Sequence, residues 1–458
     1  MTRIYPDVAS LEPEELNILC SEYLKNNNID PEISERMGVK RGLRNADGTG
    51  VLAGLTNVCD VLGYERKPDG EIVPIPGHLI FRGVDLDVLV KESVEKDRFM
   101  FEEVVWLLLF GALPSRENLD RFCKILESHR ELPKGFADDM ILNSPSPNIM
   151  NKMSRSVLAM YSYDEHAEDT SLENILRQSI NLIAELPTMM INAYQIKRRV
   201  YDRESMYFHY PTEGHSTAEH ILSTYRIDKK FTHEEAKLLD LCMMVHADHG
   251  GGNCSTFTCR VLSSAGSDTY AAISAAIGCL KGPKHGGANL KVMNQLDYIL
   301  AHVENPNDDD EVREFLRKII RKEAGDGSGL IYGIGHAVYT LSDPRAQILK
   351  KHAAKLAYEK GFGRDYEMLC AIERLAPGVF QEEKGSKRVC ANVDLFSGLI
   401  YRMLGINEDL YTPLFAISRI PGWCAHRVEE VVFANRIIRP AYKYLGTGID
   451  YVSLEDRD

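Results

Sequence analysis

The sequence predicts a mostly α-helical protein with one small β-hairpin near its N-terminus. From Asp85 onward, apolar residues recur with the period of helices, and almost no stretch alternates as a strand does. The exceptions are short β-like pieces around Val51–Leu62 and His78–Arg82, with Asp69-Gly70 between them as a hairpin turn. The length of 458 residues leaves room for two to four domains with sizeable cores.

Capping residues and helix breakers set the expected helix boundaries. Ser115 is the N-cap candidate of a helix that follows Pro114, and the glycines from Gly250 onward end the helix before them. Pro187 should kink or break the helical segment Glu173–Arg199. The other helices are expected at residues 11–36, 101–109, 215–225, 233–247, 255–264, 269–280, 288–300, 310–323, 344–358, 366–375, 395–404, 413–434 and 437–445.

Composition and charge exclude several classes of partner. The net charge of −13 argues against nucleic-acid and membrane-surface binding, so an anionic ligand needs a local basic pocket. The ten cysteines form no Cys-x-x-Cys pair, which is typical of reduced thiols in a cytoplasmic protein. Met1–Glu15 lacks the apolar region of a signal peptide, and the most apolar run, Val104–Leu113, is too short to span a bilayer.

The stretch Lys281-Gly-Pro-Lys-His-Gly-Gly-Ala-Asn289 joins two helical patterns and is the first candidate site. Gly286 and Gly287 let the backbone approach a ligand closely or adopt a positive φ. His285 precedes a helix N-terminus, whose dipole disfavours an imidazolium, so a neutral, donor-capable histidine is expected. The alternative is a helix–turn–helix corner with an incidental surface histidine.

Three further stretches place a histidine or an aspartate at a helix end beside small residues: 246–255, 333–345 and 391–397. In the first, His246 and His249 could share a helical face as metal ligands. Asp248 or Cys254, together with His285, could complete such a set. Against a metal, the His-Glu-x-x-His motif and the usual Cys/His spacing of zinc sites are absent. His246 has the alternative of being a hydrogen-bonded core histidine.

The histidines and aspartates of these stretches could instead act in proton transfer. Asp394 lies between apolar neighbours, so burial can tune its pKa for a general base. His285 and His336 can donate hydrogen bonds to two oxygens. This set suits enolisation beside one carbonyl, followed by attack on a second, polarised carbonyl. Three arginines offer planar forks for carboxylates, although each alone could be a surface ion pair: Arg345, Arg419 and Arg439.

Together these motifs resemble the signature blocks of the citrate synthase family. The three blocks are Gly282-Pro-Lys-His-Gly-Gly-Ala-Asn289, Gly335-His-Ala-Val-Tyr339 with Asp343-Pro-Arg345, and Asn392-Val-Asp-Leu-Phe-Ser-Gly398. They occur in the family's order with compatible spacing, and the resemblance runs from about Arg41 to the C-terminus. Further similar segments are residues 246–250, 253–256, 82–86, 101–111, 422–426 and 435–440.

The resemblance implies a two-domain, almost all-helical homodimer. A large domain would comprise residues 1–284 and 394–458 and hold the dimer interface and the oxaloacetate site. A small domain, residues 285–393, would bind CoA and close over the cleft, which excludes water from a reactive enolate. Arg439 would reach into the partner subunit's site.

The resemblance also implies the reaction and the roles of the residues. Acetyl-CoA, oxaloacetate and water would give citrate and CoA, the entry step of the tricarboxylic acid cycle, with no cofactor beyond the CoA substrate. Asp394 would remove a methyl proton, His285 would hydrogen-bond the thioester oxygen, and His336 would polarise the ketone. Oxaloacetate would be held by His249, Arg345 and Arg419.

For CoA the resemblance implies the backbone of Leu330, Ile331, Gly333 and Gly335, with Lys384, Lys387, Arg388 and Asn392 nearby. Ala337 departs from the many relatives that have arginine after the catalytic histidine, which removes one possible CoA contact. Three alternatives remain open: a 2-methylcitrate synthase that uses propionyl-CoA, a catalytically silent regulatory relative, and a zinc hydrolase.

Overall fold

The structure is a computed structural model that describes residues 12–27, 29–45, 47–385, 388–434, 436–446 and 448–457. The chain divides into two compact units, Met1–Gly54 and Leu55–Asp458. In the first unit, helices α1 (Pro13–Asn26) and α2 (Pro31–Arg36) each begin with a proline, where the missing N–H costs no hydrogen bond. All candidate site residues lie in the second unit.

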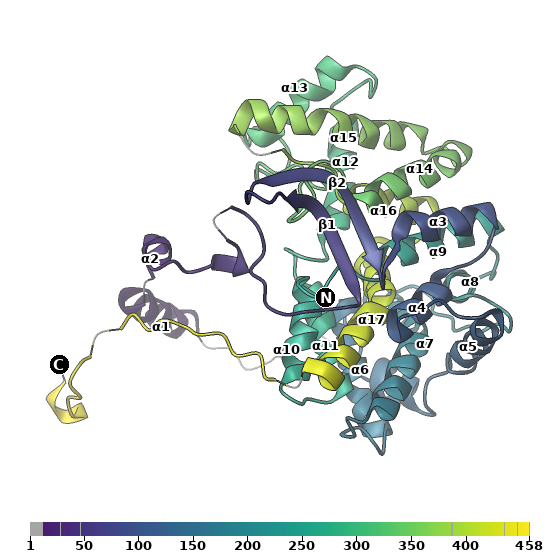
Figure 1. Ribbon diagram of the computed structural model, residues 1–458, viewed down its shortest axis with the longest axis horizontal. Helices are drawn as coiled ribbons and strands as arrows, with labels where there is room; N and C mark the ends of the chain where they lie inside the picture. The colour runs from purple at the N-terminus through teal and green to yellow at the C-terminus, as the bar shows by residue number, and fades with distance from the viewer. Residues whose placement is uncertain are drawn as a thin grey trace. The chain divides into compact units, whose positions relative to one another are not determined.

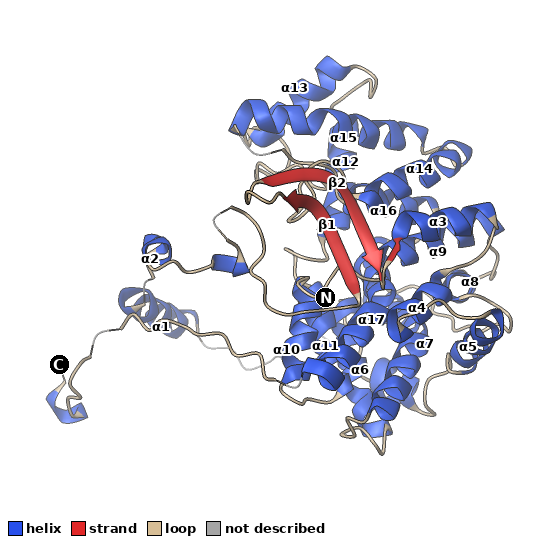
Figure 2. Ribbon diagram, viewed as in Figure 1, coloured by secondary structure: helices blue, strands red, loops and turns tan. Residues whose placement is uncertain are grey.

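The sheet of the second unit has three antiparallel strands in the order β1-β2-β3: Cys59–Arg66, Ile72–Phe81 and Val84–Asp85 (Figure 2). The turn between β1 and β2 is closed by the Gly70 N–H, which donates to the Lys67 carbonyl at 2.9 Å. Gly70 has φ +89°, a conformation that glycine adopts without strain. The hairpin predicted at Asp69-Gly70 is confirmed, whereas residues 51–57 are not a strand.

The rest of the second unit is helical, which confirms the predicted fold class. Its longer helices are α3 (Leu86–Glu95), α4 (Phe101–Phe110), α5 (Arg116–Ser128), α6 (Ile149–Met160), α7 (Leu172–Lys197), α8 (Thr217–Tyr225), α9 (His233–His246), α10 (Cys254–Ser264), α11 (Thr269–Leu280), α12 (Ala288–Leu300), α13 (Asp309–Ile320), α14 (Pro344–Glu359), α15 (Gly363–Lys384), α16 (Asp394–Met403) and α17 (Tyr411–Glu429). Ser115 caps α5 as predicted, by accepting the N–H of Asn118.

Three expectations about helix boundaries need correction. At Pro187 a kink or a break was expected, and the break does not occur: helix α7 continues through Pro187, because burial of most of its residues stabilises the helix despite the missing N–H. Helix α15 likewise passes through Pro377 and is longer than the predicted 366–375. Residues 437–445 form no helix, and exposed side chains such as Tyr442 show why: the segment buries no apolar face.

Helix α17 lies at the centre of the second unit and packs against α4, α7, α9, α10 and α11. Its Trp423 is fully buried. Helices α12 to α16 gather at the top of the view in Figure 1, and α6, α7, α10 and α11 lie at the bottom beside α17. No helix among the described residues is long and apolar enough to cross a membrane.

Candidate active site

The loop between α9 and α10 carries His249 and is held by a buried carboxylate. The Oδ2 of Asp248 accepts the N–H of Gly250 at 3.0 Å and lies 3.1 Å from His426 Nε2. Although burial raises it, His426 lowers the pKa of Asp248 below its ordinary value, so Asp248 is ionised. On α17, a Cβ at Gly422 would lie 2.4 Å from Asp248 Oδ1, so only glycine lets this helix approach the loop so closely.

Arg419 on α17 is the most unusual group of the site. Its side chain is fully buried, and its Nε donates to the carbonyl of His246 at 2.5 Å. Its two terminal nitrogens, Nη1 and Nη2, are buried and have no hydrogen-bond partner among the described residues. Burial lowers the pKa of Arg419 to about 10, so the guanidinium stays charged at neutral pH. A buried cation with two unused donors is suited to a carboxylate.

His249, in the loop after α9, also has a buried polar atom without a described partner. Its Nε2 is buried without a hydrogen bond among the described residues. Burial is the main cause that lowers the pKa of His249 well below its ordinary value, and Arg345 lowers it further. The ring is therefore neutral, and its centroid lies 5.0 Å from that of His336 and 5.6 Å from that of Tyr339.

The tautomer of His336 is set by the backbone. Its Nδ1 accepts the N–H of Val338 at 3.1 Å and the N–H of Tyr339 at 3.0 Å. A ring nitrogen that accepts carries no proton, so in His336 the hydrogen is on Nε2 and that atom is a donor. The Tyr339 ring stacks on His336 with centroids 4.6 Å apart, which fixes the plane of the imidazole.

Arg345 is oriented by its neighbour Asp343 at the start of α14. Asp343 accepts the Arg345 backbone N–H as the helix cap, at 3.0 Å. The same carboxylate accepts Nε of Arg345 at 3.0 Å and Nη2 at 2.7 Å, a bidentate pair. The pair is almost completely buried. The arginine is therefore held in one direction before any ligand binds.

Asp394 is the first residue of α16, and its N–H donates to Asn392 Oδ1 at 3.0 Å. Burial raises the pKa of Asp394 to about 6, although the charges of Arg345 and Arg419 act to lower it. A carboxylate with a raised pKa that is still ionised at neutral pH is suited to general-base catalysis.

His285 lies in the turn between α11 and α12. Its Nε2 is 3.1 Å from the Ser255 hydroxyl, which also accepts the indole N–H of Trp423 at 3.2 Å. Burial lowers the pKa of His285 to about 4, and Arg419 lowers it further, so the expected neutral histidine is present.

Of the two reasons expected for the glycines of this turn, a positive φ does not apply. Among the glycines with positive φ, neither Gly286 nor Gly287 occurs. A Cβ at Gly286 would instead lie 2.3 Å from the Leu280 carbonyl oxygen, and the Gly286 N–H donates to that oxygen at 2.9 Å. Gly286 thus allows the turn to fold back on the end of α11.

The structure also reveals a buried polar chain beneath the site that sequence reasoning missed. His426 Nδ1 accepts from Arg260 Nη2 at 2.7 Å, so its Nε2 carries the proton and donates to Asp248. Arg260 Nη1 donates to Glu430 at 2.6 Å, and Nη2 also bonds Glu429. His426 is 178 positions from Asp248 and 166 from Arg260, and no local sequence motif predicts these contacts. Polar residues on the otherwise apolar α17 were the one available signal.

The residues expected to bind CoA lie in the segment 330–335, at Asn392 and at the end of α15. Gly333 and Gly335 have φ values of +81° and +103°, and the Asn392 side chain donates to the Gly335 carbonyl at 2.9 Å. Ile331 is buried and Leu330 is half exposed. Lys384 is exposed, and its Nζ donates to the Gly329 carbonyl at 3.1 Å.

Two more of the expected binding residues stay predictions, Arg439 (expected in the partner subunit's site) and Lys387. Arg439 is exposed on the C-terminal segment and takes part in no described interaction at the site. Lys387 lies outside the described residues.

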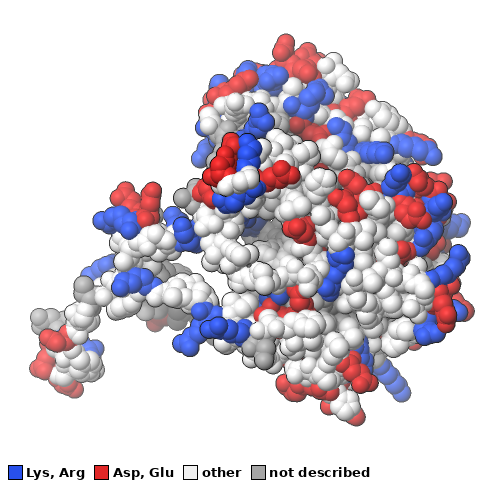
Figure 3. Space-filling model, viewed as in Figure 1, with Lys and Arg blue, Asp and Glu red and all other residues white. Residues whose placement is uncertain are grey.

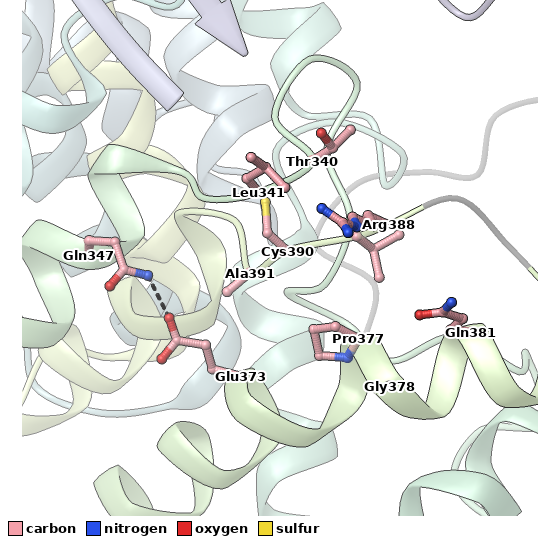
Figure 4. A pocket seen from close by; sticks show the side chains of 11 residues that line it. Thr340, Leu341, Gln347, Glu373, Pro377, Gly378, Gln381, Arg388, Cys390 and Ala391 are labelled. Carbon is pink, nitrogen blue, oxygen red and sulfur yellow. Dashed lines mark hydrogen bonds between the residues drawn. The ribbon is translucent and has the colours of Figure 1, made fainter. Parts of the chain in front are cut away.

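Next to this loop, Arg388 lines a cavity of about 390 Å³ between α14 and α15. Figure 4 shows its side chain near Leu341 and Cys390, with the Gln347–Glu373 hydrogen bond of 2.6 Å on the opposite side. On the face of the second unit seen in Figure 3, basic and acidic side chains are mixed, so an anion would meet only local clusters of cations.

The comparisons with known proteins agree with this geometry. The family model described as citrate synthase, C-terminal domain, matches residues 45–441. The chain is 36% identical to the citrate synthase of Haloferax volcanii over 83% of its length and 93% of the relative's. The chain belongs to the citrate synthase family. Membership of this family indicates that the protein has citrate synthase activity.

Other members of the family extend the match. The citrate synthase of Synechocystis is 34% identical over 83% of this chain and 88% of its own. Among solved structures, the Thermoplasma acidophilum citrate synthase, a ternary complex with carboxymethyl coenzyme A and oxaloacetate, superposes with a TM-score of 0.74. It is 26% identical and covers 91% of this chain and 99% of its own. The described residues contain no group of three or more His, Cys, Asp or Glu side chains that could hold a metal ion.

Proposed function

We propose that the chain condenses acetyl-CoA with oxaloacetate and water to give citrate and CoA, with Asp394, His285 and His336 as the catalytic residues. The observation that carries the proposal is the buried guanidinium of Arg419, which has two donors without a hydrogen-bond partner among the described residues. Leaving such donors unsatisfied costs free energy, and a ligand carboxylate removes that cost. Arg345 would bind the second carboxylate of oxaloacetate, and His249 Nε2 would bind one of its oxygens.

Asp394 would remove a proton from the methyl carbon of acetyl-CoA. Its pKa of about 6 keeps it ionised at neutral pH, yet gives it more basicity than an ordinary aspartate. His285 would donate a hydrogen bond to the thioester oxygen as negative charge develops there. Its pKa of about 4 makes it a neutral donor, so it would stabilise an enol or enolate without a full positive charge.

The carbon nucleophile would then attack the ketone of oxaloacetate. The Nε2–H of His336 is the donor that would polarise the ketone oxygen and protonate it as the carbon–carbon bond forms. The product, citryl-CoA, would be hydrolysed by water in the same cleft to citrate and CoA. The buried Asp248–His426–Arg260 chain would hold the His249 loop in place during both steps.

Assembly and domain movement belong to the same proposal. A homodimer would place the exposed Arg439 in the partner subunit's site. Residues 285–393 would form a small domain that closes over the cleft, against a large domain of residues 1–284 and 394–458. The CoA phosphates would be bound near Arg388, Lys384 and Lys387. The enzyme would act in the cytoplasm.

A free-thiol release assay tests the function. Purified enzyme is given oxaloacetate with either acetyl-CoA or propionyl-CoA, with and without EDTA. We expect rapid release with acetyl-CoA that EDTA leaves unchanged. A preference for propionyl-CoA would make the chain a 2-methylcitrate synthase, and inhibition by EDTA would indicate metal chemistry. No release with either thioester would contradict the proposal.

A further inference from the structure

Two cysteines next to the His285 turn form a close thiol pair. Cys254 is the first residue of α10 and Cys279 is the last but one of α11. The two helices are consecutive, joined by a short turn, and pack side by side, so these residues lie level with each other at the open end of the helix pair. Their sulfur atoms are 3.2 Å apart, and both cysteines are free.

The pair is open to reagents. Cys254 is exposed and Cys279 is half-buried. Both line a cavity of about 380 Å³ together with Pro283, Lys284 and His285. A small disulfide therefore has room to approach either sulfur, unlike the buried thiols of Cys242 and Cys259 elsewhere in the core.

The same pair is directly linked to the catalytic turn. Ser255, which follows Cys254, is the residue whose hydroxyl lies 3.1 Å from His285 Nε2. On the other side, the carbonyl of Cys279 accepts the N–H of Gly282 at 3.1 Å, and Gly282 in turn accepts the N–H of His285 at 2.9 Å. A covalent bond between the sulfurs would thus join both supports of His285.

We propose that Cys254 and Cys279 form a reversible disulfide by exchange with a low-molecular-weight disulfide, and that this bond slows catalysis by restraining the His285 turn. One protein thiolate attacks the small disulfide, forming a mixed disulfide and releasing one small thiol. The second protein thiolate then attacks the protein sulfur and releases the other small thiol. The protein loses two electrons and two protons, and the small disulfide gains both.

Two physical points shape the expected behaviour. A disulfide needs its sulfurs about 2 Å apart, so the two side chains must move together by about 1 Å. A misplacement of about 1 Å near reacting groups can lower turnover by about a hundredfold. Burial, together with the adjacent Cys279 thiol, raises the pKa of Cys254 to about 11, so the exchange is slow at neutral pH and accelerates as the pH rises.

The test treats the intact enzyme with oxidised glutathione at mildly alkaline pH and follows both mass and turnover. The wild type is compared with Cys254→Ser, Cys279→Ser and, as a control for another exposed thiol, Cys20→Ser. Each activity is measured relative to the same variant before treatment.

We expect a Cys254–Cys279 cross-linked peptide and a loss of turnover of about tenfold to a hundredfold in the wild type and in Cys20→Ser, reversed by dithiothreitol. The Cys254→Ser and Cys279→Ser variants should keep their activity and carry at most a glutathione adduct. Failure to find the cross-linked peptide would overturn the proposal. The expected loss of activity rests on the role proposed for His285. A cross-linked peptide without loss of turnover would therefore contradict the effect on catalysis but not the formation of the disulfide.

Discussion

The oxaloacetate side of the proposed site is built from buried, fixed groups, whereas several residues of the proposed CoA side are exposed. Arg419 and His249 have exposed fractions of 0% and 8%. Each has a buried side-chain nitrogen with no hydrogen-bond partner among the described residues. On the CoA side Leu330 is 50% exposed, and Arg388 and Lys384 lie on the surface. We infer from the contrast that the folded chain already orients groups for a dicarboxylate, whereas CoA binding would rely on exposed cations.

The difference has an energetic reason. Groups that are already oriented lose little entropy when the ligand arrives, as for Arg345 held by Asp343. Exposed lysines and arginines gain less from a phosphate, because water screens the charge and the side chain must be ordered. Substitutions on the first side should therefore cost much more than substitutions on the second.

The largest effect is expected from Asp394→Ala, which removes the base between the two sides. Turnover should fall by about a thousandfold, since a positioned general base typically contributes about 10²–10⁴. Oxaloacetate binding, measured by calorimetry, should stay within about threefold because the arginines remain. Asp309→Ala, an exposed aspartate on α13, is the matched control. Near-normal turnover of Asp394→Ala would show that the base has been assigned wrongly.

Arg419→Lys tests the buried side directly. Lysine keeps the charge but not the planar pair of donors, so KM for oxaloacetate should rise by about a hundredfold. Arg427→Lys on the same helix is the control, because Arg427 is also buried but already bonds Thr269, Ser263 and Ser267. Steady-state kinetics with varied oxaloacetate gives both values. An equal rise in KM for the two variants would mean that Arg419 has only a structural role.

The raised pKa of Asp394 predicts how stability depends on pH. Its folded value of about 6 lies above the ordinary value of an aspartate, so the stability it contributes is present below the ordinary value and is lost as pH rises through about 6. Asp394→Asn removes that loss. Unfolding free energy at pH 8 should increase by about 1–3 kcal/mol, with little change at pH 4. Denaturant unfolding at both pH values checks this, and an Asn variant less stable than the wild type at pH 8 would refute the raised pKa.

The smallest effect is expected on the exposed side. Arg388→Gln should raise KM for acetyl-CoA by about threefold to tenfold, an effect that fades at high salt because the charge is screened. Oxaloacetate affinity should not change. Arg374→Gln, an exposed arginine of α15 that pairs with Asp309, serves as the control. A change in KM for oxaloacetate but not for acetyl-CoA would contradict the proposal that Arg388 binds CoA.

Much of the fold could be predicted because its signals are local. Helical periodicity, the Ser115 cap and the Asp69-Gly70 turn act over a few residues, and the structure contains each. The predicted break at Pro187 failed because packing around α7 outweighs the lost hydrogen bond. The close approach of Gly286 to the Leu280 carbonyl was also missed, and the positive φ that the sequence allowed there does not occur.

The contacts of the site that join residues distant in the sequence were harder to predict. The histidine and aspartate motifs identified the candidate residues, but not the tautomer of His336, which depends on two backbone N–H groups. The Asp248–His426–Arg260 chain joins segments more than a hundred residues apart, so no spacing in the sequence reveals it. Such contacts are set by the tertiary fold alone.

Exchange of the methyl protons of acetyl-CoA with D₂O tests the central claim most directly, because it isolates deprotonation by Asp394 from the condensation that follows. The enzyme is incubated with acetyl-CoA and a dicarboxylate without a reactive ketone, such as malate, which occupies the arginine pocket. We predict exchange in the wild type and in His336→Gln, and none in Asp394→Asn. Exchange that persists in Asp394→Asn would contradict the proposed mechanism.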